Sequence, residues 1–225
     1  MTQARLTLCL LAACLGSPAA PLDDALARLD KAAAGFRGMT AQIRKISYTA
    51  LVKETSEESG RIVLYRPKPK DLRMLVEFDQ PSPRAVAFQG GKIQLYYPRL
   101  MTVQEYDLGK QGGLVDQFLL LGFGTPVRDL RRAYSIRYAG EEKLNGLAAD
   151  RLELTPLSQE AAQHVKSVEI WVSQTDGMVI QQKVNQPSRD YVLVAYSGIQ
   201  VNPALTPAQV RLNLPKGVKK ETPQR

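Results

Sequence analysis

The stretch that decides the fold is residues 61–107, which read RIVLYRPKPKDLRMLVEFDQPSPRAVAFQGGKIQLYYPRLMTVQEYD. Apolar residues recur there at every second position, first in Ile62 and Leu64 and then from Leu72 to Phe78. A period of two is typical of strands that bury one face. Gly90-Gly91 and the prolines between the runs mark turns. The stretch therefore predicts a meander of four or five antiparallel strands with one apolar and one polar face.

The apolar face of this meander admits two interpretations. The commoner one is packing against an ordinary core. The other is a curved sheet whose apolar face lines a cavity for a lipid-like ligand. Periodicity alone does not separate the two. The candidate cavity residues in the meander are Leu64, Leu72, Met74, Val76, Phe78, Phe88, Leu95 and Tyr97.

A second apolar stretch follows the meander between two pairs of glycines. Leu114, Phe118 and Leu121 share one helical face, with Gly112-Gly113 before them and Gly122 after them. A short apolar helix of this kind is a buried core helix or a lid over an apolar cavity. We therefore add these three residues to the candidate cavity set.

The N-terminal residues indicate export. Residues 1–19 combine a basic start, an apolar run and small residues, as in a secretory signal peptide. An alternative is a lipoprotein signal that ends before Cys14, because Leu11-Ala12-Ala13-Cys14 resembles a lipobox. Cys14 is then a possible lipidation site. Both cysteines of the chain lie in this segment, so ordinary cleavage leaves no thiol or disulfide.

Length and charge favour one exported domain. The chain has 225 residues, 44% of them hydrophobic, and a net charge of +8. We expect a single domain over residues 20–218 and a flexible tail over 219–225. A basic chain often binds nucleic acid, but export argues against that partner. Most lysines and arginines are expected on a solvated surface, and an anionic membrane or an acidic protein is the alternative partner.

The remaining elements follow from the same patterns. Helical spacing predicts a helix over 22–37, and a change of phase within 39–52 predicts a bulged strand. Residues 53–60 are expected to form a charged loop. Alternating runs from Tyr134 predict further strands, the last of them over 210–214.

The sequence contains little catalytic chemistry. His164 is the only histidine and lies in a polar stretch, where a solvated residue is the usual outcome. No Cys/His set has metal-ligand spacing, and no glycine-rich phosphate loop follows a strand. We expect no enzyme, no metal and no cofactor.

The order of several short motifs resembles a known family. These are Leu29-Asp30-Lys31, residues 62–67 (IVLYRP), residues 95–98 (LYYP), Asp176-Gly177 and residues 212–218 (LNLPKGV). Together with Gly90-Gly91-Lys92 they resemble the LolA-type periplasmic carriers that move lipoproteins to the outer membrane.

The resemblance implies a fold and a function. The fold is mainly β with a few helices: an incomplete antiparallel β-barrel with a helical lid that encloses a hydrophobic cavity. The function is a periplasmic carrier that binds lipoprotein acyl chains and delivers them toward the outer membrane. The implied partners are an inner-membrane lipoprotein-releasing transporter and an outer-membrane acceptor. The protein is expected to be a monomer.

The resemblance also implies a role for Arg66, which matches the arginine that holds the lid shut by bonding to backbone carbonyls. One departure is the absence of an aromatic residue soon after Arg66-Pro67. Either Leu72 is the partner in lid closure or the loop differs from that of the family. Two alternatives share the fold. They are a LolB-like acceptor anchored to the outer membrane through Cys14 and an envelope sensor that binds lipid or lipoprotein.

Overall fold

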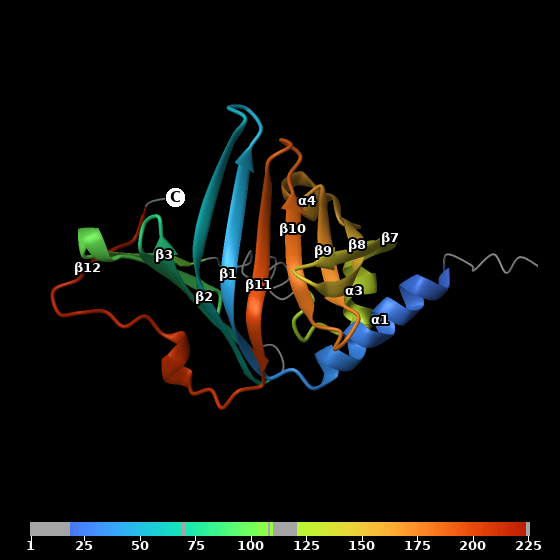
Figure 1. The fold of residues 1–225 in the computed structure, drawn as a ribbon. Coiled ribbons are helices and arrows are strands. Elements are labelled where there is room, and N and C mark those ends of the chain that lie inside the picture. The colour runs from blue at the N-terminus through green and yellow to red at the C-terminus, as the bar shows by residue number, and fades with distance from the viewer. Residues whose placement is uncertain (1–18, 69–70, 108, 110–120, 224–225) are drawn as a thin grey trace, which may run out of the picture.

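The computed structural model describes residues 19–68, 71–107, 109 and 121–223. Its described strands form one open sheet of twelve, in the order β12-β6-β5-β4-β3-β2-β1-β11-β10-β9-β8-β7 (Figure 1). All neighbours are antiparallel except β12 and β6, which are parallel. The strands are β1 (Gly38–Thr49), β2 (Glu54–Lys68), β3 (Asp71–Gln80), β4 (Arg84–Gln89), β5 (Lys92–Tyr97), β6 (Thr102–Asp107), β7 (Tyr134–Leu144), β8 (Leu147–Pro156), β9 (Ser167–Ser173), β10 (Val179–Asn185), β11 (Tyr191–Val201) and β12 (Lys219–Glu221).

The sheet is open and unclosed, consistent with the incomplete barrel that the resemblance implied. One face, here called the inner face, carries a core that joins both ends of the sheet. Strand register aligns Leu64 on β2 with Met74 on β3 and Phe88 on β4, so that cross-strand neighbours stack along this face.

Helices cover one half of the inner face. Helix α1 (Ala19–Ala34) and helix α3 (Val127–Ala133) contact each other and β7. Leu26 and Leu29 of α1 are buried in the core, as expected of the apolar stripe of an amphipathic helix. A third helix, α4 (Gln159–His164), packs on β8.

The C-terminal residues cover the opposite, outer face of β2–β6. A 3₁₀ helix, η3 (Pro207–Val210), packs against β2 and β3, and the chain then returns to the edge of the sheet as β12 (Figure 1). A second set of apolar side chains is buried on this side, namely Val63, Leu75, Ala87, Tyr96, Val103 and Val210. The expectation of a polar outer face was therefore wrong for this half, because the C-terminal segment shields it from water.

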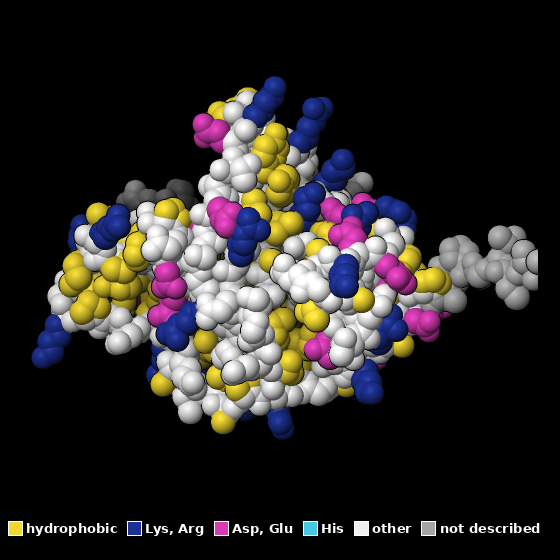
Figure 2. All heavy atoms as spheres, viewed as in Figure 1, with side chains coloured by type: hydrophobic (Ala, Val, Ile, Leu, Met, Phe, Trp, Pro, Cys, Tyr) yellow, Lys and Arg dark blue, Asp and Glu magenta, His cyan; other side chains and the backbone are white. Residues whose placement is uncertain are grey.

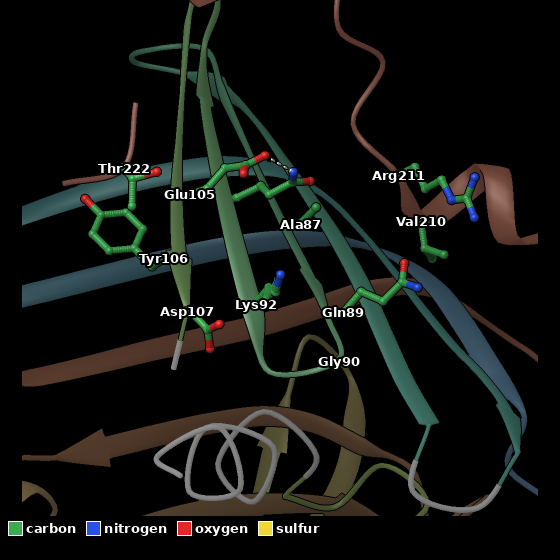
Figure 3. Close-up of a pocket in the computed structure, with 11 residues that line it drawn as sticks. Ala87, Gln89, Gly90, Lys92, Glu105, Tyr106, Asp107, Val210, Arg211 and Thr222 are labelled. Carbon is green, nitrogen blue, oxygen red and sulfur yellow. Dashed lines mark hydrogen bonds between the residues drawn. The ribbon is translucent and has the colours of Figure 1, made fainter. Parts of the chain in front are cut away.

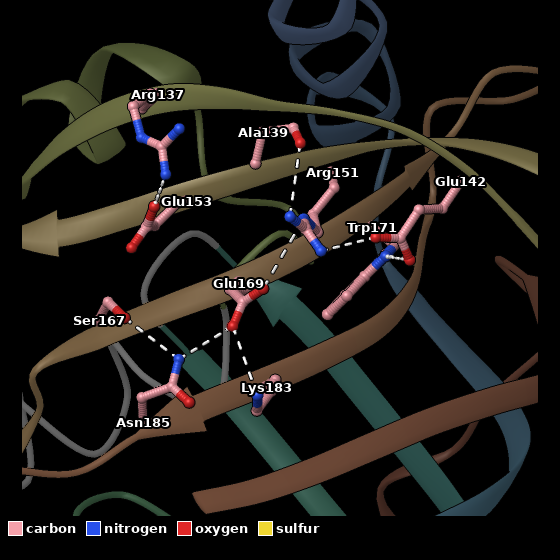
Figure 4. A network of polar contacts seen from close by, with 10 residues as sticks. All are labelled: Arg137, Ala139, Glu142, Arg151, Glu153, Ser167, Glu169, Trp171, Lys183 and Asn185. Atoms are coloured by element: carbon pink, nitrogen blue, oxygen red, sulfur yellow. Dashed lines mark hydrogen bonds and ion pairs between the residues drawn. The ribbon is translucent and has the colours of Figure 1, made fainter. Parts of the chain in front are cut away.

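The outer face of β7–β10 carries a network of charged side chains (Figure 4). Arg151 pairs with Glu142 at 2.6 Å, and the Trp171 indole donates to the same carboxylate at 2.8 Å. Glu169 accepts from Asn185 at 3.0 Å and lies 3.7 Å from the Lys183 ammonium. Polar residues alternate here with the apolar inner side chains, as the sequence predicted.

Four boundary predictions were wrong. Helix α1 ends at Ala34 rather than residue 37. Residues 54–60 belong to β2 and pair with β1, whereas we expected a loop over 53–60. Residues 210–214 form the end of η3 and irregular chain instead of a strand. Lys219–Glu221 is a strand, where we expected a flexible tail.

The bulge in β1 lies nearer the start of the strand than the sequence predicted. The register of β1 against β11 shifts between Thr40 and Gln42, earlier than the change of phase in the sequence. Pairing with β2 continues without a shift, so Ile46 and Tyr48 lie on the outer face.

Candidate functional site

The Arg66 guanidinium joins three parts of the chain at the end of β2. Its Nη1 donates to the Gly124 carbonyl at 2.5 Å. Its Nη2 donates to the Phe36 carbonyl at 2.5 Å and to the Ala33 carbonyl at 3.5 Å. Carbonyls at a helix C-terminus lack partners within the helix, and a planar guanidinium can serve several of them at once. Arg66 therefore fastens the end of α1 to residues 121–126, which we call the 121–126 segment.

The surroundings of Arg66 are partly apolar. The guanidinium lies 5.7 Å from the centre of the Phe36 ring, and burial lowers the pKa of Arg66 from its usual value. An arginine keeps its proton even so, because its ordinary pKa is above 12. Its charge is then available to strengthen the hydrogen bonds to the carbonyls.

A row of aromatic rings leads from Arg66 across the inner face. The centres of the Phe36 and Phe123 rings are 6.2 Å apart, and those of Phe123 and Tyr196 are 5.1 Å apart in an edge-to-face arrangement. Phe36 and Phe123 are both buried. Phe123 thus occupies the apolar space between α1 and the sheet.

The 121–126 segment is held at two points. Gln182 on β10 donates from its amide nitrogen to the Leu121 carbonyl at the start of the segment, while Arg66 donates to the Gly124 carbonyl in its middle. Gly124 has φ +70°, and a Cβ at this position would lie 2.7 Å from Arg66 Nη1 and 2.8 Å from the Phe36 ring. Only glycine permits this close approach without strain.

A pocket of about 570 Å³ opens beside Arg66. This volume is in the range of small-molecule sites. Its lining comes from the end of α1, the end of β2, the start of β3 and the 121–126 segment, and includes Phe36, Arg66, Leu72, Gly124 and Pro126.

The structure brings most of the predicted cavity residues together. Seven of them are buried in one core on the inner face: Leu64, Leu72, Met74, Val76, Phe78, Phe88 and Leu121. Leu95 is opposite Val86 on the same face, and Leu95 and Tyr97 are only half-buried. Leu114, Phe118 and Cys14 lie outside the described residues. Whether this face binds lipid stays a prediction.

The sequence patterns did not predict a role for Phe123, Gln182 or Tyr196. Phe123 stands between Gly122 and Gly124 and belongs to no periodic run. Gln182 had a signal in the sequence, because it stands midway between Ile180 and Val184, where alternation would place an apolar residue. The structure puts it at an inward-facing position between the register partners Ile170 and Val194. A polar residue in the apolar phase of a strand is typical of a bonded or functional position.

A second pocket, of about 450 Å³, lies on the outer face between β4–β6 and the C-terminal residues (Figure 3). Lys92, Glu105 and Asp107 line it from the strands, and Val210 and Arg211 line it from the C-terminal side. Gln94 donates to Glu105 at 2.6 Å. Its mixed charges contrast with the largely apolar side chains of the inner face.

The described residues contain no group of three or more His, Cys, Asp and Glu side chains that could hold a metal ion. In the same part of the chain, no helix is long and apolar enough to span a membrane.

Comparison with solved structures supports the fold. A conserved protein of unassigned function from Thermus thermophilus matches with a TM-score of 0.55 at 15% identity, covering 90% of this chain and 99% of that one. LprF from Mycobacterium bovis matches with a TM-score of 0.50 at 12% identity, covering 85% and 98%. Proteins of the LolA superfamily are among the structural neighbours. One from Nitrosomonas europaea has 10% identity and a TM-score of 0.40, covering 84% and 97%.

A further neighbour is longer than this chain. MucB matches with a TM-score of 0.52 at 17% identity over 88% of this chain, which spans 64% of MucB. No family model and no curated protein matches the sequence. At these identities the comparisons establish the fold alone.

Proposed function

We propose that this protein is a periplasmic carrier that binds the acyl chains of lipoproteins on its inner face and delivers them toward the outer membrane. The observation that carries the proposal is the apolar inner face, closed at one end by Phe123 and fastened there by Arg66. Each CH₂ group buried on such a face contributes about 0.8 kcal/mol, so a few acyl chains would bind firmly without covalent chemistry.

The closed arrangement supplies a means of release. Phe123 and the 121–126 segment occupy apolar space that acyl chains would take. Hydrogen bonds to a charged group contribute about 1.5–3 kcal/mol each. The bonds of Arg66 to Gly124 and Phe36 then favour the closed, empty state, and this bias helps to expel the cargo. In this scheme Leu72, the candidate partner in lid closure, lines the same pocket as Arg66 and Gly124.

The scheme needs two partners, as the resemblance implies: an inner-membrane transporter that loads the carrier and an outer-membrane acceptor. It requires no catalytic residue, metal or cofactor.

The test is the transfer of a labelled lipoprotein from loaded carrier to acceptor membranes. Arg66→Leu should fold and accept cargo but release it at least about tenfold more slowly, since about 1.4 kcal/mol of lost bias corresponds to a factor of ten. Arg66→Lys should also be impaired, because a point charge cannot reproduce the planar fork. Gly124→Ala should slow release with Arg66 still in place, because its Cβ would displace the guanidinium.

The matched control is Arg61→Leu. Arg61 lies on the same strand, but its exposed side chain pairs with Glu77 on the outer face. Normal release is expected from this variant. Wild-type release rates in both Arg66→Leu and Gly124→Ala would refute the role of the Arg66 hydrogen bonds in release. Failure of the wild-type protein to bind acyl chains would refute the proposed carrier function.

One observation favours the LolB-like acceptor as a second candidate. The tip of the β1–β2 hairpin projects from the molecule, and its Leu51 and Val52 are 93% and 57% exposed. Basic, acidic and hydrophobic side chains lie together on this projection (Figure 2). Membrane retention that depends on Cys14 would favour the acceptor, whereas a soluble product that starts near Ala20 would favour the carrier.

A further inference from the structure

A buried polar pair interrupts the apolar inner face. Gln182 is 9% exposed, and its register partners on the neighbouring strands are the aliphatic residues Ile170 and Val194. Tyr196, one strand away on β11, points its hydroxyl at Gln182. Burial of polar groups among aliphatic side chains is unfavourable unless they are hydrogen-bonded, so both groups require partners.

The pair forms a directed chain of hydrogen bonds. The Tyr196 hydroxyl donates to Gln182 Oε1 at 3.0 Å. This bond fixes the orientation of the amide, because the oxygen faces Tyr196 and the nitrogen is turned the other way. The Gln182 nitrogen then donates to the Leu121 carbonyl. Burial also raises the pKa of the Tyr196 hydroxyl, which keeps it a donor at neutral pH.

The carbonyl that Gln182 binds belongs to a segment the cargo would displace. Leu121 lies two residues from Phe123, and both are buried in the inner core. Movement of the 121–126 segment away from the sheet would leave the Gln182 amide without an acceptor in a site that excludes water. A ligand that supplies its own carbonyl oxygen would restore this hydrogen bond, and a pure hydrocarbon would not.

We propose that Gln182, oriented by Tyr196, is a recognition site for the ester or amide carbonyl at the head of an acyl chain. This inference rests on the proposed function, since it assumes that acyl chains enter the inner face. It adds a chemical requirement to that function: the preferred ligands are acyl chains joined through a carbonyl group, and alkyl ethers of the same length bind more weakly.

The experiment compares three probes of equal chain length. The first is a glycerol diester with two palmitoyl chains, the second is its dihexadecyl ether, and the third is the matching diamide, in which both palmitoyl chains are joined through N–H groups in place of the ester oxygens. Affinities are measured for the wild-type protein and for Gln182→Leu, Tyr196→Phe and Gln181→Leu. Gln181 is the matched control, because it is adjacent in the chain but its side chain lies on the outer face.

The wild-type protein should bind the diester or the amide probe about tenfold more tightly than the ether, the factor that corresponds to about 1.4 kcal/mol. Which of the two it prefers identifies a glycerolipid ester or an N-acyl amide as the source of the carbonyl. Gln182→Leu should abolish the preference by weakening the carbonyl probes to the level of the ether. Tyr196→Phe should reduce the preference to about threefold, a partial loss of one hydrogen bond's contribution. Gln181→Leu should leave it unchanged.

Three results would overturn the inference. Equal binding of all three probes by the wild-type protein would remove the carbonyl site but leave the proposed function intact. A preference that survives in Gln182→Leu would place the recognition elsewhere. Failure of the wild-type protein to bind any probe would refute both proposals. If Gln182→Leu does not fold, Tyr196→Phe decides, because it keeps the ring and removes only the hydroxyl; an unreduced preference there would overturn the inference.

Discussion

The two halves of the sheet have the same alternating pattern but different covers. In the β7–β10 half, α1 and α3 lie over the inner face, and Leu152, Ile170 and Val172 are fully buried. In the β4–β5 part of the other half, the inner-facing Val86 and Leu95 are only half-buried. The helix-covered half therefore resembles a permanent core, and the less covered half has apolar surface that a ligand could still bury.

The outer faces of the two halves also differ in the side chains they carry and in what covers them. The C-terminal segment covers apolar side chains on β2–β6, whereas β7–β10 carry the charged network of Arg151, Glu142 and Glu169. An inner face that is to remain available for a ligand needs its sheet stabilised from the other side. The C-terminal segment provides that support in the half with the less covered inner face.

The largest expected effect concerns the ion pair that fastens α1 to the sheet. Asp150 has a side chain only 3% exposed, 2.5 Å from Arg28 of α1, and it also accepts from Gln174 at 2.9 Å. Asp150→Ala should lower the free energy of unfolding by about 3–5 kcal/mol, because it leaves Arg28 without its buried partner. Urea denaturation measures this change.

The control for Asp150 is a pair in the other half. Arg44 and Glu57 are 57% and 52% exposed, so Glu57→Ala should cost less than about 1 kcal/mol. Similar losses in the two variants would mean that burial does not distinguish the pairs, and the comparison of the two halves would fail.

A second prediction compares leucines on the two inner faces. Leu152→Ala should lower the free energy of unfolding by about 2–5 kcal/mol, since the helix-covered core cannot easily fill the cavity. Leu95→Ala should cost less than about 1 kcal/mol, because its side chain is already partly in water. Leu95→Ala should instead weaken binding of an acyl probe.

Urea denaturation and titration with the probe check this pair of variants together. A large loss of stability in Leu95→Ala with unchanged probe binding would assign Leu95 to the permanent core.

The last prediction is a pH dependence in the less covered half. The Arg84 hydrogen bond, aided by Lys45, lowers the pKa of Glu58 from its ordinary 4.5 to about 2, against the opposing effect of burial. A lowered folded-state pKa gives stability that is fully present above pH 4.5 and lost as the pH falls toward 2.

Thermal unfolding at several pH values should therefore show a steeper loss between pH 4.5 and 2 in the wild-type protein than in Glu58→Gln. The charge cluster itself is part of the inner face, since Arg84 lies 4.2 Å from the centre of the Phe78 ring. Identical slopes in the two proteins would show that this cluster contributes nothing to acid sensitivity.

Much of the fold followed from local patterns. The run from Leu72 to Phe78, the Gly90-Gly91 turn and the helical stripe of Leu26 and Leu29 each specify their own face or bend. The acidic stretch before Gly60 was misjudged because charged residues are usual in loops, whereas the register of β1 extends β2 back to Glu54. Pairing with a neighbour outweighed local composition there.

The candidate site was only partly predictable. The role of Arg66 was implied by the family resemblance, and the structure places its guanidinium on the carbonyls of Gly124 and Phe36. The roles of Phe123, Gln182 and Tyr196 could not be derived, because these residues come from a glycine-flanked segment and two separate strands. Their contacts join residues between 14 and 87 positions apart in the chain.

By itself, the sequence determined which side chains face together, because a strand's period of two is a property of its own backbone. It also determined the turns, where glycine is the residue that accepts a positive φ. Only the tertiary structure decided which faces are covered by α1, by the C-terminal segment or by Phe123. Cover depends on packing between residues far apart in the chain, and no local pattern encodes the partner that a face will meet.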